Sequence, residues 1–94
     1  MRYLAAVLLL ALGTGASADH EEAFELAREG KIQPLSTLLE QQQRLRPGRV
    51  LEVELERDDE RMIYEIEVLD ARGTVWELRF DAASGELLRQ EAED

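Results

Sequence analysis

Apolar and charged residues alternate through three segments between residues 51 and 80, and this period of two restricts the fold more than any other feature. Successive side chains of a β-strand point to opposite faces of a sheet, so each segment has one apolar and one charged face. We therefore expect three antiparallel strands with one buried face, and Leu87 and Leu88 predict a short fourth strand. The apolar positions are Leu51, Val53 and Leu55, then Met62, Tyr64, Ile66 and Val68, then Trp76, Leu78 and Phe80.

The turns between these segments predict how the strands pair. A three-residue hairpin loop within residues 70–74, with Gly73 in the left-handed conformation, pairs Val68 with Trp76, Ile66 with Leu78 and Tyr64 with Phe80. A four-residue loop of residues 58–61 pairs Leu55 with Tyr64, Val53 with Ile66 and Leu51 with Val68. Only this parity keeps the apolar sets on one side, because a slip of one residue would turn one set to water.

Two helices are predicted before the first strand. Asp19 is placed to cap the first helix and Gly30 to end it, whereas Pro34 begins a second helix that ends near Arg46. Each has an apolar stripe, which contains Ala23, Phe24, Leu26 and Ala27 in the first and Leu35, Leu38, Leu39 and Leu45 in the second. We expect an α+β domain with the two N-terminal helices packed on one face of a three- to four-stranded antiparallel sheet.

The first 18 residues have the pattern of a secretory signal peptide. Arg2 precedes an apolar run that is too short to span a bilayer, and Ala16 and Ala18 are small residues around a plausible cleavage site. We predict an exported, periplasmic or extracellular protein with a signal peptide at 1–18, a domain at 19–90 and an acidic tail at 91–94. The chain contains no cysteine, so neither a lipidated cysteine nor a disulfide is expected.

The strong negative charge limits the classes of partner. The net charge is −10 at pH 7, and removal of Arg2 with the signal peptide would make it one unit more negative. Nucleic acids and anionic membrane surfaces are therefore poor partners, whereas cationic peptides, metal ions and basic protein surfaces remain suitable.

The predicted register places glutamates in rows on the polar face of the sheet. One row contains Glu52, Glu67 and Glu77, and the next contains Glu54, Glu65 and Arg79. Like charges on neighbouring strands destabilise a sheet, and only the second row contains a cation of its own. We hypothesise that the first row receives a basic side chain from a partner or a loosely held divalent ion. The alternative is a solvated face that keeps a small protein soluble.

Catalysis is not expected, and no cofactor is predicted. The chain has a single histidine, His20, and its paired acids would lie on an exposed sheet without the apolar pocket that separates two pKa values. After cleavage His20 would be the second residue, where a free amine, an amide nitrogen and the imidazole can bind Cu(II). Its alternative role is that of an exposed residue at a helix start.

Two aspartate and glycine pairs are predicted to shape turns. The carboxylates of Asp70 and Asp81 can accept hydrogen bonds from backbone N–H groups, while Gly73 and Gly85 adopt backbone angles that other residues resist. An EF-hand needs more oxygen ligands at set spacing, so a calcium loop is not predicted here. Trp76 is expected in the core, with a groove beside it as the alternative.

Three stretches resemble the PepSY domain (peptidase propeptide and YpeB), and most closely its small exported stand-alone proteobacterial members. These stretches are residues 48–56, residues 64–68 with Asp70 and Gly73, and residues 81–87, in which Ser84 stands where the family commonly has threonine. The resemblance implies a helix packed on an antiparallel sheet and a role in binding and restraining peptidases. Other PepSY domains belong to membrane and cell-envelope proteins with different tasks.

The leading functional hypothesis is a soluble periplasmic binding module that engages another envelope protein, such as a peptidase, through its acidic sheet face or an exposed strand edge. A second hypothesis is a cation-responsive accessory sensor that acts through a membrane receptor. A third is a structural homodimer in which an unprotected edge pairs with its own copy.

Overall fold

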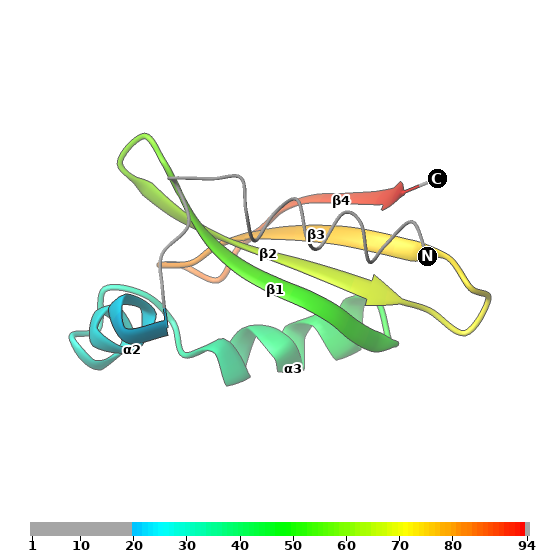
Figure 1. Ribbon diagram of the computed structural model, residues 1–94, viewed down its shortest axis with the longest axis horizontal. Coiled ribbons are helices and arrows are strands. Elements are labelled where there is room, and N and C mark those ends of the chain that lie inside the picture. The colour runs from blue at the N-terminus through cyan, green and yellow to red at the C-terminus, as the bar shows by residue number, and fades with distance from the viewer. Residues whose placement is uncertain (1–19, 94) are drawn as a thin grey trace.

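The computed structural model describes residues 20–93 (Figure 1). The predicted signal peptide and the Asp19 cap lie outside these residues. Among the described residues, no helix combines the length and the apolar character needed to cross a membrane. Within residues 20–93 the elements are two helices followed by four strands: α2 (His20–Arg28), α3 (Leu35–Leu45), β1 (Arg49–Asp58), β2 (Arg61–Leu69), β3 (Val75–Asp81) and β4 (Leu87–Glu93).

The four strands form one antiparallel sheet in the order β1-β2-β3-β4. The predicted α+β class is therefore confirmed. β4 is longer than the short strand we expected, and residues 91–93, which we assigned to an acidic tail, pair with β3. The register shifts where Phe80 pairs with Leu87 and Arg79 pairs with Arg89, so Leu88 is an extra residue in β4. Beyond this bulge each residue of β4 faces the opposite side of the sheet from the side that a simple alternation starting at Leu87 would predict.

The pairing of β2 with β3 follows the predicted register. Val68 lies opposite Trp76, and the pairs of Ile66 with Leu78 and of Tyr64 with Phe80 are also observed. Gly73 has a φ of 86°, as the left-handed position of the loop requires. The loop and the alternation therefore define the same register, and both apolar sets face one side of the sheet.

The pairing of β1 with β2 departs from the prediction at Leu51. The residue opposite Val68 is Val50, because the register shifts between Val50 and Glu52 and makes Leu51 the extra residue of a bulge. Beyond the bulge the register is as predicted, with Val53 opposite Ile66. The bulge lets both Val50 and Val53 pack against the core, which a strict alternation would not allow.

A single apolar core lies between α3 and one face of the sheet. Figure 1 shows α3 running along this face, and Leu38 of α3 is fully buried in the same cluster as Ile66, Leu78 and Phe80. Burial of such side chains provides most of the free energy that folds a small domain. The complete cluster is Ile32, Leu38, Leu55, Tyr64, Ile66, Val68, Leu78, Phe80 and Ala82.

Two residues of the predicted helical stripes are outside this core. Leu45 is the last residue of α3 and is 43% exposed, and Phe24 of α2 is 67% exposed. In contrast, Gln42 is fully buried, and its side-chain amide donates a hydrogen bond to the Arg46 carbonyl oxygen at 3.0 Å. Helical spacing correctly predicted that the face of α3 containing Leu38 is buried. It did not predict that the same face is exposed at Leu45, the end of the helix.

Polar contacts join the C-terminal half of α3 to the sheet. The Gln41 side chain donates a hydrogen bond to the Gly85 carbonyl oxygen at 2.9 Å, and Arg46 donates one to Oε1 of Gln90 at 2.8 Å. The Arg46 guanidinium also lies 3.6 Å from the centroid of the Trp76 ring. Trp76 packs against the core as predicted, and Arg46 covers a face of its ring.

We expect Leu38→Ala to lower the free energy of unfolding by about 2–5 kcal/mol, because it opens a cavity in the core. Leu45→Ala removes the same atoms at an exposed position and should cost about 1 kcal/mol or less. Urea unfolding followed by circular dichroism measures both changes. Equal losses for the two variants would contradict the central position of Leu38.

Candidate functional site

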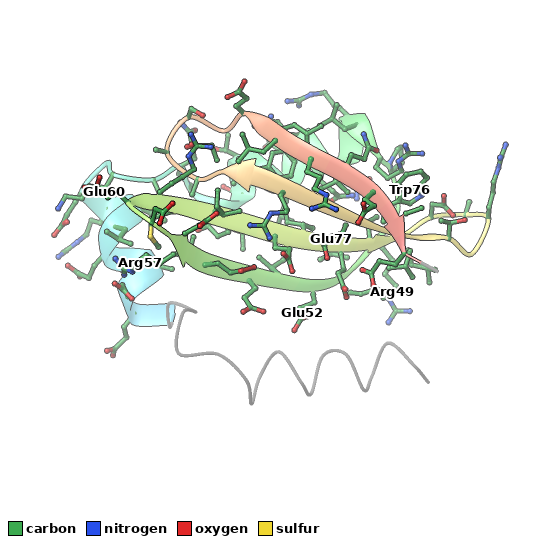
Figure 2. The ribbon with its side chains drawn as sticks, turned by 90° about the horizontal axis from the view of Figure 1, so that it is seen from above. Arg49, Glu52, Arg57, Glu60, Trp76 and Glu77 are labelled. Atoms are coloured by element: carbon green, nitrogen blue, oxygen red, sulfur yellow. The ribbon has the colours of Figure 1, made fainter. Side chains whose placement is uncertain are left out.

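The face of the sheet opposite α2 and α3 is rich in carboxylates, and no helix among the described residues covers it (Figures 1 and 2). We call it the acidic face. Its side chains belong to the residues that alternate with the core residues along each strand. All four strands contribute charged residues to it. The charged residues at these positions are Arg49, Glu52, Glu54, Glu56, Asp58, Arg61, Glu65, Glu67, Glu77, Arg79, Asp81, Arg89, Glu91 and Glu93.

The strand pairing arranges most of these side chains in two rows. In the first row Glu52 pairs with Glu67 and Glu67 with Glu77, as the sequence predicted, and β4 adds Glu91 opposite Glu77. The second row is Glu54, Glu65, Arg79 and Arg89. Neighbouring pairs in the first row are therefore carboxylates of like charge, while the second row ends in two cations.

The second row and its neighbour Glu56 form ion pairs. Nη1 of Arg79 pairs with Glu65, and it lies 3.5 Å from a carboxylate oxygen of Glu56. Glu65 is only 9% exposed. Burial, followed by the charge of Glu77 and by the adjacent Glu56 carboxylate, raises the pKa of Glu65 to about 7, although the positive charge of Arg79 acts in the opposite direction.

Glu67 is the most buried carboxylate of the first row, with 4% of its surface exposed. Its Oε1 atom is inaccessible to water and has no hydrogen-bond partner. Burial raises the pKa of Glu67 to about 8, and a hydrogen bond to the Glu93 carboxyl and the charges of Glu93, Glu52 and Glu77 act in the same direction. Within residues 20–93, no salt bridge involves any of these four glutamates.

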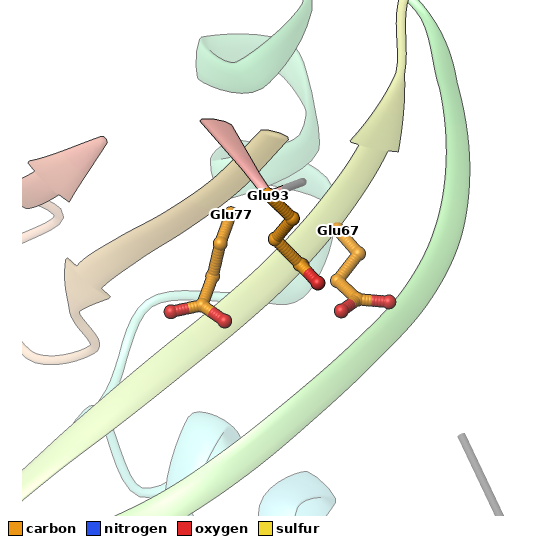
Figure 3. Close-up of side chains that lie close together, drawn as sticks. All are labelled: Glu67, Glu77 and Glu93. Atoms are coloured by element: carbon orange, nitrogen blue, oxygen red, sulfur yellow. The ribbon is translucent and has the colours of Figure 1, made fainter. Parts of the chain in front are cut away.

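Glu93 lies opposite Val75, next to the first row, and it was not among the predicted site residues. It extends from β4 to lie close to Glu67 of β2 and Glu77 of β3 (Figure 3), and one carboxylate oxygen of each residue lies within 4.8 Å of the others. Burial and the charge of Glu93 raise the pKa of Glu77, whereas Arg79 and Arg89 lower it. The charged residues Arg89, Glu91 and Glu93 alternate along the chain, and this alternation is the sequence pattern that could have placed Glu93 on the acidic face.

The expected solvated face is therefore wrong for Glu65 and Glu67, which are buried. Both belong to β2, an inner strand whose side chains are flanked by long charged side chains of the neighbouring strands. Such carboxyl groups can take up protons near neutral pH or hold a cation. The side chain of His20, our candidate copper ligand, is outside the described part of the structure, so it is not placed relative to this face.

The turn aspartates direct their oxygens to the backbone. Oδ1 of Asp81 accepts hydrogen bonds from the N–H groups of Ala83 at 2.9 Å and Ser84 at 3.0 Å. Oδ1 of Asp70 accepts two backbone hydrogen bonds within its own loop, and its Oδ2 accepts one from Nε1 of Trp76 at 2.9 Å. Gly85 has a φ of 81°, a left-handed conformation that favours glycine. These contacts give both aspartates a structural role in the turns.

We expect the stability of the protein to fall as the pH rises from about 5 to about 9 in buffer that contains a metal chelator. The folded-state pKa values of Glu65, about 7, and Glu67, about 8, lie above the unfolded value of 4.5. The folded protein thus binds more protons than the unfolded chain between these values, so deprotonation removes stability. Thermal unfolding at a series of pH values measures the effect.

Glu67→Gln should flatten this pH dependence. It removes the group with the highest of these pKa values, and at about pH 9 it relieves like-charge repulsion worth up to about 1 kcal/mol for each pair. Glu60→Gln is the matched control, because Glu60 is exposed in the β1–β2 turn and the charge change is the same. The interpretation is wrong if Glu67→Gln and the wild type have the same slope.

Comparison with known proteins agrees with the predicted resemblance. A sequence model of the PepSY family, described as peptidase propeptide and YPEB domain, matches residues 22–91, which cover both helices and most of the sheet. No curated protein and no solved structure gave a match. The chain therefore belongs to the PepSY family.

Proposed function

We propose that this protein is an exported PepSY-type binding module that engages and restrains a peptidase or another protein of the cell envelope. Membership of a family described as a peptidase propeptide domain supports a regulatory role that depends on protein contacts. The predicted signal peptide at residues 1–18 supports a periplasmic location. PepSY domains are generally non-catalytic, so the proposed mode of action is binding and not turnover.

The observation that carries the proposal is the lack of a salt bridge at three of the four carboxyl groups of the first row. Glu52, Glu67 and Glu77 form no salt bridge within residues 20–93, although other acidic residues of this face do. A basic side chain from a partner would supply the missing cation. The attraction between this cation and the glutamates would stabilise only the complex. Complementary charge of this kind raises the association rate and selects among partners.

The edge of β1 provides a second contact for the same partner. β1 is an edge strand of the sheet, and it carries Glu52, Glu54 and Glu56 on the acidic face. An extended segment added beside β1 would place alternate side chains next to these glutamates. A segment with basic residues at every second position therefore fits both the backbone and the charges of this edge.

A cation-responsive accessory sensor that acts through a membrane receptor is the second candidate function. The proximity of the Glu67, Glu77 and Glu93 carboxylates favours it. The two functions have different requirements. A sensor needs a metal ion for its response, whereas a binding module can engage its partner through the first row in the presence of a chelator.

Capture from envelope extract of the source organism tests the binding function. The protein, produced by expression of the full-length sequence, is chemically crosslinked in the extract with a chelator present, and captured proteins are identified by mass spectrometry. We expect the wild type to enrich a partner that the triple variant Glu52→Gln, Glu67→Gln, Glu77→Gln enriches at least about tenfold less, because the variant lacks the charges that select the partner. If the partner is a peptidase, adding purified protein should lower its activity in a dose-dependent manner.

The matched control is the triple variant Glu40→Gln, Glu60→Gln, Glu86→Gln. It removes the same number of charges from exposed positions outside the acidic face, on α3 and in two loops. Equal capture by the two triple variants would exclude the acidic face as the binding surface. A captured peptidase whose activity is unchanged by the protein would exclude restraint.

A further inference from the structure

Three carboxylates from three different strands converge at one end of the acidic face. Glu67 is on β2, Glu77 is opposite it on β3, and Glu93 is on β4 opposite Val75. Figure 3 shows the three side chains close together, and one carboxylate oxygen of each lies within 4.8 Å of the other two. The chain thus brings together residues that are up to 26 positions apart, from Glu67 to Glu93.

The burial of Glu67 is a second observation that points to a ligand. Its side chain is directed into the cluster, only 4% of the residue is exposed, and Oε1 has no hydrogen-bond partner. Oε2 of Glu93 is likewise buried without a partner. A buried polar atom without a partner costs free energy, and the cost is larger for a charged group. A cation bound between these oxygens would remove that cost.

The neighbouring basic side chains do not provide this cation. Arg79 pairs with Glu65 and Glu56, and Arg89 pairs with Glu91 at 2.7 Å. The remaining carboxylate that faces the cluster is Glu52 of β1, whose Oε2 is also buried without a partner and whose charge adds to the repulsion at Glu67. Within residues 20–93, no salt bridge therefore neutralises Glu67, Glu77 or Glu93, and Glu52 adds to the negative charge beside them.

The chemistry of the ligands selects a hard divalent cation. All three groups offer only oxygen, which suits Ca²⁺ or Mg²⁺, whereas structural zinc sites use nitrogen and sulfur ligands. Oxygens that bind the same Ca²⁺ at about 2.3–2.6 Å can lie up to about 5 Å apart, but the shorter bonds to Mg²⁺, about 2.0–2.1 Å, limit this separation to about 4.2 Å. One oxygen of each group lies within 4.8 Å of the others, close to the separations of Ca²⁺ ligands, so small rotations of the side chains would bring all three to bonding distance of one ion.

We propose that Glu67, Glu77 and Glu93 form a calcium-binding site that links the edge strand β4 to β2 and β3. Bidentate carboxylates and water molecules complete the coordination of Ca²⁺ in such oxygen-rich sites. The bound ion stabilises the folded protein, because the unfolded chain does not hold the three strands together. The site does not rest on the proposed protein-binding function, since it needs no protein partner, and it would provide the cation response of the second candidate function.

Thermal unfolding and two-dimensional NMR with calcium chloride test the site. The protein, purified after expression of the full-length sequence and stripped with a chelator, should unfold at a higher temperature as calcium rises to about 10 mM, which covers the affinities of extracellular calcium modules. The backbone amide signals that move should centre on Glu67, Glu77 and Glu93. Magnesium chloride at the same ionic strength should produce a smaller shift.

Glu93→Gln is the decisive variant because Glu93 is near the end of an edge strand, where the substitution leaves the core intact. It should lower the calcium affinity by on the order of tenfold or more through the loss of one charged ligand. Glu60→Gln, which removes an exposed glutamate of the β1–β2 turn, should bind calcium as the wild type does.

Three outcomes would overturn the site. They are no calcium-dependent change at about 10 mM, equal responses of Glu93→Gln and Glu60→Gln, and a magnesium effect as large as that of calcium. None of them affects the capture experiment for the proposed function, which is performed in chelator. The two proposals can therefore fail separately.

Discussion

The packing of α3 against one face of the sheet is the interaction on which the rest of the structure depends. Leu38 is fully buried among side chains of β2 and β3, so α3 covers one face of the sheet and no helix within residues 20–93 covers the other. A sheet of four strands without this cover would expose its apolar positions, and a chain of this size has little other surface to bury. Because α3 packs on the apolar face, the alternate side chains of each strand, which include the charged ones, point to the acidic face.

The same parity also explains why the acidic face is unusual. Alternation that places Ile66 in the core places Glu65 and Glu67 on the opposite face of the inner strand β2, where neighbouring strands bury them. The sheet thus holds carboxylates with pKa values near neutrality without a conventional pocket. Deprotonation of these closely spaced carboxyl groups costs free energy, and a bound cation or a basic partner would reduce that cost.

PepSY domains are generally non-catalytic. The two proposals use overlapping parts of one surface. The protein-binding proposal relies on the first row and on the edge strand β1, whereas the calcium site lies at the junction of β2, β3 and β4. Glu67 and Glu77 belong to both, so calcium would alter the charge that a partner meets.

The sequence by itself determined the two helices within residues 20–93, the antiparallel pairing and most of the register, because helical spacing, period-two alternation and turn chemistry are local properties. The row of Glu52, Glu67 and Glu77 followed from the same pattern and is present. Only the tertiary structure decided the bulges at Leu51 and Leu88, since an extra residue is absorbed by contacts with another strand. The bulge at Leu88 places Glu93 beside Glu67, and the neighbouring strands bury Glu67, so the candidate site depends on contacts between distant residues that no local pattern encodes.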